Sequence, residues 1–262
     1  SHPYAGRWLA RIGSQVLAQG SSPSFVRSTA SQNRHKEKSL ITFIPSNNIM
    51  SFPEVFYKIQ SILTDRDDVF LVGGAVRDAL LQKPIHDLDF VCLHDPQSAA
   101  RKIANSLSGN IYCMDKEHQV YRVIHSGADS STQIIDFMLA RSPIIEHDLQ
   151  MRDFTINAMA VNLQDPQKII DPLLGAQNLS QKILKGCTPS TFIDDPIRIL
   201  RGIRIAAEGE YQIEKQTRDW MKKSVTLLGD ASIERRRGEL IKIMVSPKPD
   251  TAIRALLWLN AL

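Results

Sequence analysis

The chain has 262 residues, of which 43% are hydrophobic, 6% aromatic and 23% charged, with a net charge of +4. This composition excludes a wholly disordered chain and a collagen-like repeat. No run approaches ~18 consecutive apolar residues, so we expect no membrane-spanning helix. The three cysteines lie far apart, which excludes a zinc ribbon or a disulfide framework and fits a reducing compartment, the cytoplasm.

The positive charge is concentrated at the N-terminus. Residues 1–49 hold six Lys or Arg and one Glu, so they carry +5 and the remaining residues sum to −1. A globally basic nucleic-acid binder is therefore not indicated, and an anionic partner must be bound by a local group of cations. Residues 1–49 are also rich in Ser, which is typical of a mitochondrial or plastid transit peptide. An expression tag or upstream translated sequence before Met50 is the alternative for this N-terminal extension.

From residue 53 the hydrophobic pattern predicts alternating helices and strands. In chain order these are a helix over 53–63, a strand over 69–72, a helix over 75–83, a strand over 88–92, a helix over 96–107, strands over 121–125 and 133–139, and a helix over 154–161. Past Gly175 the pattern predicts helices only, at 195–208, 214–228, 232–245 and 249–260. We therefore expect an α/β domain over 50–175, a mixed sheet with flanking helices, and an all-helical region over 176–262. The last apolar run has no cap, so we expect this region to be truncated.

Two glycines follow the first predicted strand. Gly73 and Gly74 lead into a helix, so backbone N–H groups at its start are open to an anion. Arg77 lies one turn into that helix and can add a charged contact. This pattern predicts a triphosphate site, with a tight turn and a surface arginine as the alternative. The G-x-G-x-x-G spacing of dinucleotide-binding proteins is absent.

Three aspartates lie on predicted strands. Asp87 and Asp89 are two residues apart, so they point to one face, and their like charges favour a shared divalent cation such as Mg²⁺. A solvated edge strand is the alternative for this pair. Asp136, on a later strand, could complete the ligand set or act as the base on an attacking hydroxyl. A structural hydrogen bond is the alternative for Asp136.

This constellation resembles the nucleotidyltransferase superfamily, and later segments narrow the resemblance to class II tRNA nucleotidyltransferases and bacterial poly(A) polymerases. The segments similar to motifs B, C and D of that family are RDFTINA over 152–158, DPLLG over 171–175 and DDPIRILRGIR over 194–204. The motifs occur in the family's order and cover about 69–245. The resemblance implies an α/β nucleotidyltransferase head followed by a helical neck.

The resemblance also implies a reaction and a set of site residues. The 3′-hydroxyl of tRNA would attack the α-phosphorus of CTP or ATP and release pyrophosphate, with Mg²⁺ held by Asp87 and Asp89 and with Asp136 as a third catalytic residue. The residues implied in nucleotide binding are Gly73, Gly74, Arg77, Arg152, Asp153, Asn157, Asp195, Arg198, Arg201 and Arg204.

Asp195 and Arg198 are the implied base-reading pair. They lie three residues apart, so on a helix they would share a face. A carboxylate accepts from an exocyclic amine and a guanidinium donates to a ring nitrogen, an order that cytosine and adenine match and that guanine and uracil reverse. The pair is therefore predicted to select CTP and ATP without a nucleic-acid template. An ordinary helix salt bridge is the alternative.

Three departures from the family pattern leave alternatives open. Met151 stands where the family commonly has an arginine, and Asp194 where it usually has glutamate. Only 15 residues separate Asp136 from Arg152, where full CCA-adding members carry a longer flexible loop. Addition of the two cytidines alone, addition of adenosine alone and polyadenylation are therefore alternatives. Three His-Asp doublets leave an HD-type metal phosphohydrolase as a remote alternative.

Overall fold

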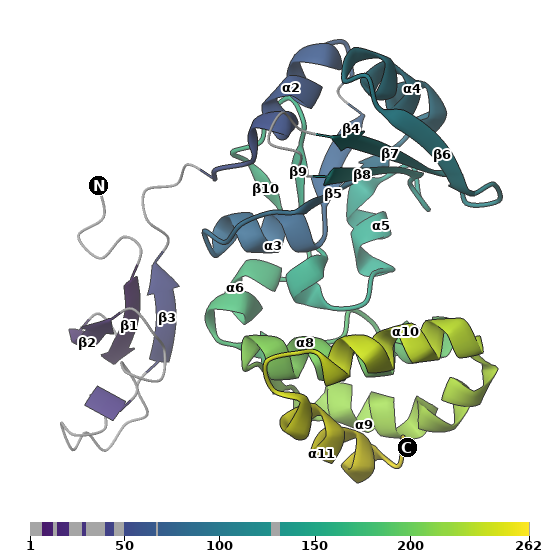
Figure 1. Ribbon diagram of the computed structural model, residues 1–262. Coiled ribbons are helices and arrows are strands. Elements are labelled where there is room, and N and C mark those ends of the chain that lie inside the picture. Colours follow the sequence, from purple (N-terminus) through teal and green to yellow (C-terminus); the bar gives the residue numbers. More distant parts are fainter. Residues whose placement is uncertain are drawn as a thin grey trace.

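The computed structural model describes residues 7–12, 15–20, 28–29, 40–44, 50–66, 68–126 and 132–261. Within the N-terminal extension it describes an antiparallel sheet of order β2-β1-β3. These strands are β1 (Arg7–Ile12), β2 (Gln15–Gly20) and β3 (Leu40–Ile44), which lie to one side of the remaining chain (Figure 1). Whether this extension is a transit peptide stays a prediction.

A seven-stranded mixed sheet of order β10-β9-β4-β5-β8-β7-β6 forms the centre of the α/β domain. Its strands are β4 (Val69–Val72), β5 (Asp87–Cys92), β6 (Asn110–Asp115), β7 (Val120–Ser126), β8 (Thr132–Leu139), β9 (Ala160–Asn162) and β10 (Ile169–Ile170). Strands β5 and β8 are parallel, and every other neighbouring pair is antiparallel. The predicted mixed sheet with flanking helices is confirmed.

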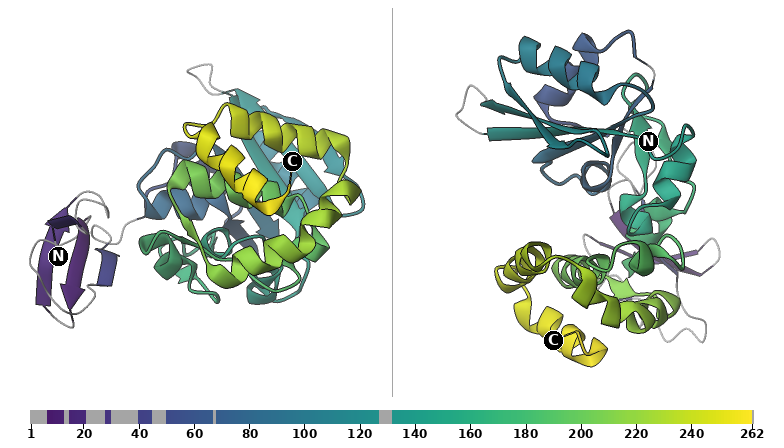
Figure 2. Two further views of the ribbon diagram at one scale, coloured as in Figure 1. Left: turned by 90° about the horizontal axis from the view of Figure 1, so that it is seen from below. Right: turned by 90° about the vertical axis from the view of Figure 1, so that its right-hand side faces the viewer.

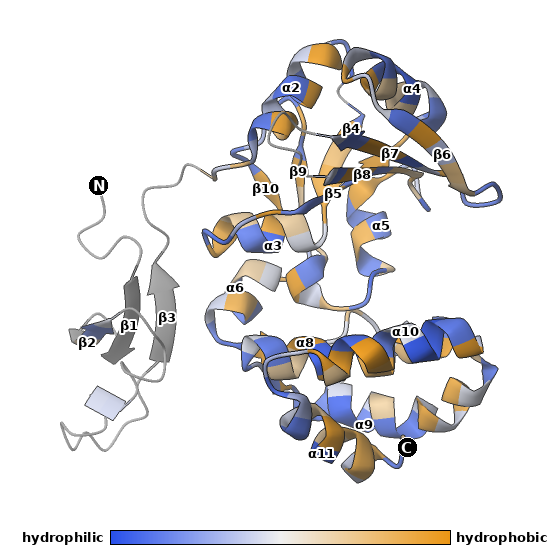
Figure 3. Ribbon diagram, in the orientation of Figure 1, coloured by the Kyte–Doolittle hydropathy of each residue, from blue (hydrophilic) through white to orange (hydrophobic). Residues whose placement is uncertain are grey.

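Helices cover both faces of this sheet (Figures 1 and 2). They are α2 (Glu54–Ile62), α3 (Gly74–Leu80), α4 (Pro96–Ser106) and α5 (Ile145–Gln150). Because side chains alternate along a strand, Leu71 joins the larger core cluster with α2 and α4, whereas Val72 joins a smaller cluster with α5. The apolar residues of these helices pack in the two core clusters. Figure 3 shows apolar and polar residues interspersed along the helices.

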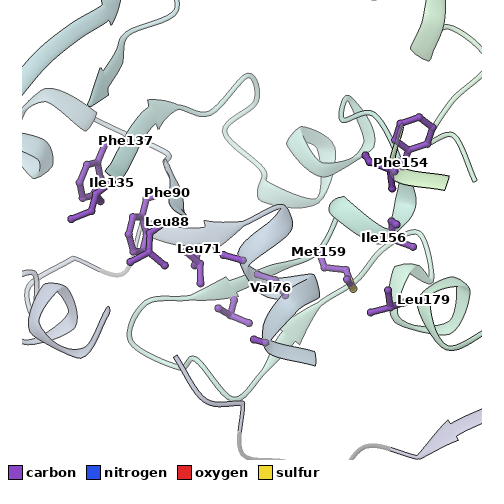
Figure 4. Close-up of a cluster of buried hydrophobic side chains, with 14 of the residues drawn as sticks. Leu71, Val76, Leu88, Phe90, Ile135, Phe137, Phe154, Ile156, Met159 and Leu179 are labelled. Carbon is purple, nitrogen blue, oxygen red and sulfur yellow. The ribbon is translucent and has the colours of Figure 1, made fainter. Parts of the chain in front are cut away.

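Stacked phenylalanines fix the larger core beneath the candidate carboxylates. The Phe90 ring lies 5.1 Å from that of Phe137 and 6.2 Å from that of Phe56, and all three rings are fully buried. Each such burial stabilises the fold by roughly 1.5–3 kcal/mol. Figure 4 shows Phe90 beside Leu88 and Phe137 beside Ile135, side chains of the two strands that carry the aspartates.

The helix predicted over 154–161 is wrong. The segment contains a short 3₁₀ helix, Thr155–Asn157, and then strand β9, which pairs antiparallel with β4. Both Ala160 and Val161 are fully buried. A strand buried on both faces has no alternating pattern, so periodicity could not separate it from a buried helix.

Helices dominate the chain from Gly175 onward and gather on one side of the sheet domain (Figure 2). They are α6 (Gly175–Ser180), α7 (Thr191–Asp194), α8 (Arg198–Gly209), α9 (Lys215–Ser224), the 3₁₀ helix Val225–Asp230, α10 (Ile233–Met244) and α11 (Pro249–Leu259). A two-stranded sheet, β11 (Ile183–Leu184) with β12 (Gln212–Ile213), was not predicted. The division into domains at residue 175 stays a prediction. Among the described residues, no helix has the length and hydropathy needed to cross a bilayer.

Candidate active site

The glycine turn lies directly beside one of the predicted metal carboxylates. Gly73 follows β4 and caps the start of α3, with φ +74°, a backbone conformation that residues with a Cβ rarely adopt. A methyl group at Gly73 would lie 3.8 Å from both Asp89 Oδ2 and Arg152 Nη1. The turn, the carboxylate and the motif B arginine therefore converge on one small region.

The three aspartates lie on two adjacent parallel strands, with Asp89 in register with Asp136. Asp136 forms a bidentate ion pair with Arg122, at 2.9 Å to Nε and 2.7 Å to Nη2. No described side chain donates a hydrogen bond to Asp87 or Asp89. The structure therefore gives Asp136 a structural partner, while its role as base or ligand stays a prediction.

Asp87 and Asp89 have the chemistry of a site for a hard divalent cation. Burial and the charges of Asp136 and Asp87 raise the pKa of Asp89, and the positive charge of Arg152 offsets only part of this effect. Within the described part of the chain, His, Cys, Asp and Glu form no group of three or more suited to a metal ion. The two carboxylates fit a cation that takes its remaining ligands from substrate phosphates and water.

A cavity of about 470 Å³ lies between the α/β domain and the helical region and is lined by residues of both. Its volume is within the range of small-molecule sites. The predicted site residues that line it are Gly73, Gly74, Asp89, Arg152, Asp153, Asn157, Asp195, Arg198 and Arg201. Motifs that are more than a hundred residues apart in sequence therefore face one space.

A second cavity, of about 360 Å³, adjoins the first. It contains the predicted site residues Arg77, Asp87 and Arg204, and Asp136 lines neither cavity. The two cavities share Gly74, Asp89 and Arg201. Asp89 therefore lies where the two cavities meet, whereas Asp87 lines the second cavity alone.

A chain of hydrogen bonds links helix α3, which follows the glycine turn, to helix α8. Arg77 Nη1 donates to Asn157 Oδ1 (2.8 Å), and Asn157 Nδ2 donates to Asp153 Oδ1 (3.3 Å). Arg201 Nε, from α8, donates to the buried Asp153 Oδ2 at 2.6 Å. Burial alone would raise the pKa of Asp153, but the charge of Arg201 and the hydrogen bonds from the Phe154 amide and Asn157 lower it. The side chains implied in nucleotide binding therefore also position one another.

Asp195 does not lie on a helix with Arg198, which corrects the prediction of a shared helix face. Asp195 has extended backbone angles (φ −152°, ψ 97°) at the end of α7, and α8 begins at Arg198. Pro196 explains this, because a residue before proline is disfavoured in the helical region. Both side chains nevertheless line the first cavity.

The terminal nitrogens of Arg198 bind the backbone of neighbouring segments. Nη2 donates to the carbonyl oxygen of Met151 (3.1 Å), and Nη1 to those of Thr191 (3.3 Å) and Arg152 (3.4 Å). Met151, which departs from the family pattern, therefore contributes its carbonyl group to the site. Arg198 Nε is 3.9 Å from Asp195 Oδ2, so the ordinary salt bridge considered as the alternative is only a long contact.

Arg204 is paired within the helical region, where Nε binds Glu239 Oε2 (2.9 Å) and Nη1 binds Glu208 (3.2 Å). These contacts give Arg204 a structural role. Its contact with a nucleotide stays a prediction. Glu239 also accepts from Lys242 Nζ (3.0 Å). Helix α10 is thus tied to α8 beside both cavities.

The sequence analysis did not assign one wall of the first cavity, or one buried carboxylate, to the candidate nucleotide site. The wall is a single face of α10, made of Arg235, Gly238, Glu239 and Lys242 at helical spacing. The carboxylate is Asp148 on α5, which accepts from the Arg141 amide (3.0 Å) and from Arg152 Nη2 (3.2 Å). The 3.6-residue period of polar side chains in α10 was the available signal, but solvated faces have the same period.

Comparison with known proteins places these motifs in a family. Residues 69–185 match the model described as poly A polymerase head domain, and residues 210–262 match the probable RNA and SrmB-binding site of polymerase A. The chain is 35% identical over 178 residues to the CC-adding tRNA nucleotidyltransferase of Geobacter sulfurreducens, covering 68% of this chain and 40% of that protein. It is 30% identical over 234 residues to the CCA-adding enzyme of Streptococcus thermophilus, covering 84% of this chain and 56% of that protein.

A solved structure agrees with these sequence relatives. The Thermotoga maritima CCA-adding enzyme complexed with tRNA_CCA superposes with a TM-score of 0.71 and 30% identity, covering 81% of this chain and 52% of that one. The chain spans about half the length of the curated relatives it matches. Together with the order of motifs B, C and D, these matches show that the chain belongs to the tRNA nucleotidyltransferase and poly(A) polymerase family.

Proposed function

We propose that the chain is a template-independent RNA nucleotidyltransferase that adds CMP, AMP or both to the 3′ end of tRNA and releases pyrophosphate. One observation carries the proposal: a single cavity is lined by the metal-type carboxylate Asp89 and by the base-reading pair Asp195 and Arg198. Residues suited to chemistry at a phosphate and residues suited to selecting a base therefore line the same cavity. The relatives named for CC and CCA addition support tRNA as the acceptor.

In the proposed reaction the RNA 3′-hydroxyl attacks the α-phosphorus of the bound nucleotide. A new P–O bond forms, the hydroxyl gives its proton to solvent water, the bond to the β-phosphate oxygen breaks, and pyrophosphate leaves with the electron pair. Asp87 and Asp89 would hold divalent cations, and we propose Mg²⁺ because both ligands are hard oxygens. A divalent cation held by these two carboxylates would lower the pKa of the hydroxyl and offset the negative charge of the triphosphate.

The chain's own residues bind and orient the triphosphate and ribose. Backbone N–H groups at Gly73 and Gly74 lie at the start of α3, beside Arg152. Asp148 fixes the Arg152 guanidinium, and Arg77 holds Asn157. Pre-oriented charges of this kind stabilise a bound triphosphate without a reorganisation of the site.

Cytidine-only addition is a second candidate, which one observation favours. The short segment between Asp136 and Arg152 is folded, with Ile145 and Leu149 of α5 buried against the sheet. Asp148 further ties this segment to Arg152. A change of pocket shape from cytosine to adenine requires a movable element, and lids and loops commonly supply one. An anchored segment at this place therefore favours addition of the two cytidines.

We propose a reducing compartment for this activity, the cytoplasm or, if residues 1–49 are a transit peptide, an organelle. All three cysteines are free. Burial raises the pKa of the Cys92 thiol to about 12, so this side chain is inert toward oxidation at neutral pH. These properties support a protein that carries thiols and not disulfides.

The proposed function is tested by replacing Asp87 with alanine. We expect Asp87→Ala to abolish nucleotide incorporation into tRNA while leaving the fold and nucleotide binding intact, because Asp87 is exposed and supports only the cation. The matched control is Asp165→Ala, which removes an exposed carboxylate outside both cavities. Incorporation by Asp87→Ala at a level similar to that of the control would contradict the metal assignment.

A further inference from the structure

The short ion-pair partner of the base-reading carboxylate comes from another helix. Asp195 Oδ2 accepts from Arg235 Nη2 at 2.8 Å, whereas Arg198 Nε is 3.9 Å from the same oxygen. The terminal nitrogens of Arg198 are engaged with backbone carbonyl oxygens. Among the described residues, no side chain binds Asp195 Oδ1. Arg235 thus holds one oxygen of the carboxylate and leaves the other free.

Arg235 is placed to orient this carboxylate within the cavity. It lies on the face of α10 that lines the first cavity, together with Gly238, Glu239 and Lys242. Asp195 itself has an extended backbone between two helices, so no helical turn fixes its side chain. A charge-assisted hydrogen bond to one oxygen restricts rotation of the carboxylate and directs the lone pairs of the other oxygen.

We propose that Arg235 is a positioning residue that sets base selectivity by holding Asp195 Oδ2 so that Oδ1 accepts from the exocyclic amine of cytosine or adenine. This inference rests on the proposed function. Without Arg235 the carboxylate turns freely, and Oδ1 no longer keeps its place opposite the amine. Arg235 touches no base in this role, so its effect on selectivity passes entirely through Asp195.

The ion pair between Arg235 and Asp195 is exposed, which supports a role in base selectivity and not in folding. The Arg235 side chain is 54% exposed and that of Asp195 is 26% exposed. Exposed ion pairs contribute little to stability. A direct contact between Arg235 and an RNA phosphate is the competing role, and it predicts an equal loss for every nucleotide.

The experiment measures kcat/KM for CTP and for UTP with one tRNA primer, using the full chain. We expect Arg235→Met to lower the CTP/UTP ratio about tenfold, the size of a lost base-reading contact, and Arg235→Lys to lower it less. Arg237→Met is the matched control, since it removes one positive charge from an exposed position on α10 outside both cavities. The control is expected to keep the wild-type ratio even where it weakens RNA binding.

A double-mutant cycle distinguishes action through Asp195 from independent action. In the Asp195→Ala background, Arg235→Met is expected to cause no further change of the ratio. Equal losses for CTP and UTP, additive effects in the cycle, or a thermal midpoint well below that of Arg237→Met would each overturn the proposal. A wild-type chain that transfers neither nucleotide would instead contradict the proposed function, so the two failures are distinguishable.

Discussion

Asp153 is a buried carboxylate whose charge is balanced inside the site. It accepts from Arg201 Nε (2.6 Å), the Phe154 amide (2.7 Å) and Asn157 Nδ2 (3.3 Å). Although burial opposes it, the net effect of these partners is a lowered pKa. A carboxylate with a lowered pKa in the folded state stabilises the fold above its unfolded pKa. That stabilisation is lost as the pH falls through the pKa of Asp153 in the folded state.

We therefore expect Asp153→Asn to reduce the free energy of unfolding at neutral pH. The reduction is about 1–3 kcal/mol, because a charge-assisted hydrogen bond is lost but the Arg201 side chain is 45% exposed and gains water. The difference from wild type should shrink as the pH falls below the ordinary aspartate value of 3.8. Urea denaturation at several pH values measures it. A difference that is the same at all of them would contradict this role for Asp153.

At the scale of elements, the residues of motif C form and hold the start of helix α6. Asp171 accepts from the amides of Gly175 (2.6 Å) and Ala176 (3.0 Å), which the helix leaves unpaired. A methyl group at Gly175 would lie 2.1 Å from the backbone oxygen of Thr155. Motif C thus holds α6 against the segment that carries Asn157.

Gly175→Ala is expected to destabilise the protein by about 1–3 kcal/mol, since the atom in the way is backbone and cannot rotate aside. Gly229→Ala is the control, because no atom lies within 4 Å of the corresponding position. We expect the control to change the free energy of unfolding by at most about 0.5 kcal/mol. Chemical denaturation of both variants measures the difference, and equal stabilities would contradict this account of motif C.

The elements that sequence predicted correctly have local signals. Strand β4 is a short apolar run ended by glycines, and α4 begins with Pro96 and a capping Asp95. Strand β9 was missed because burial on both faces removes alternation. The helix expected from residue 195 begins three residues later, since Pro196 keeps Asp195 extended. Boundaries and doubly buried strands therefore depend on contacts that one segment does not contain.

Much of the candidate site was predicted as a set of residues, but its pairings were not. Nine of the residues that the resemblance implied line one cavity. They could be named in advance because each belongs to a motif that is recognisable in the sequence. The partner of Asp136 depends on the cross-strand register that places Arg122 opposite it. The wall formed by α10 depends on how the helices pack, and its polar residues resemble a solvated face. Tertiary contacts, which no single motif specifies, determine these features.

At the scale of the whole molecule, the site exists only where two structural parts meet. The α/β domain supplies Asp89 and Arg152, and the helical region supplies Asp195 and Arg198. Phe154 packs so closely on α8 that a methyl group at Gly202 would lie 2.5 Å from its ring. Packing thus fixes the distance between Asp89 and the pair Asp195 and Arg198, as the proposed selection of bases by the protein itself requires.

The proposed function requires this chain to select nucleotides and to transfer them to an RNA 3′ end. The most direct measurement offers the full chain tRNA primers ending at the discriminator base, at C or at CC, with each of the four nucleotides separately and with Asp87→Ala as the blank. We expect CTP to be incorporated on the first two primers, UTP and GTP to be rejected, and ATP to be used poorly on the CC-ended primer if addition is cytidine-only. Efficient ATP use on that primer would establish full CCA addition in its place. Equal use of all four nucleotides, or incorporation by the Asp87→Ala blank, would contradict the account.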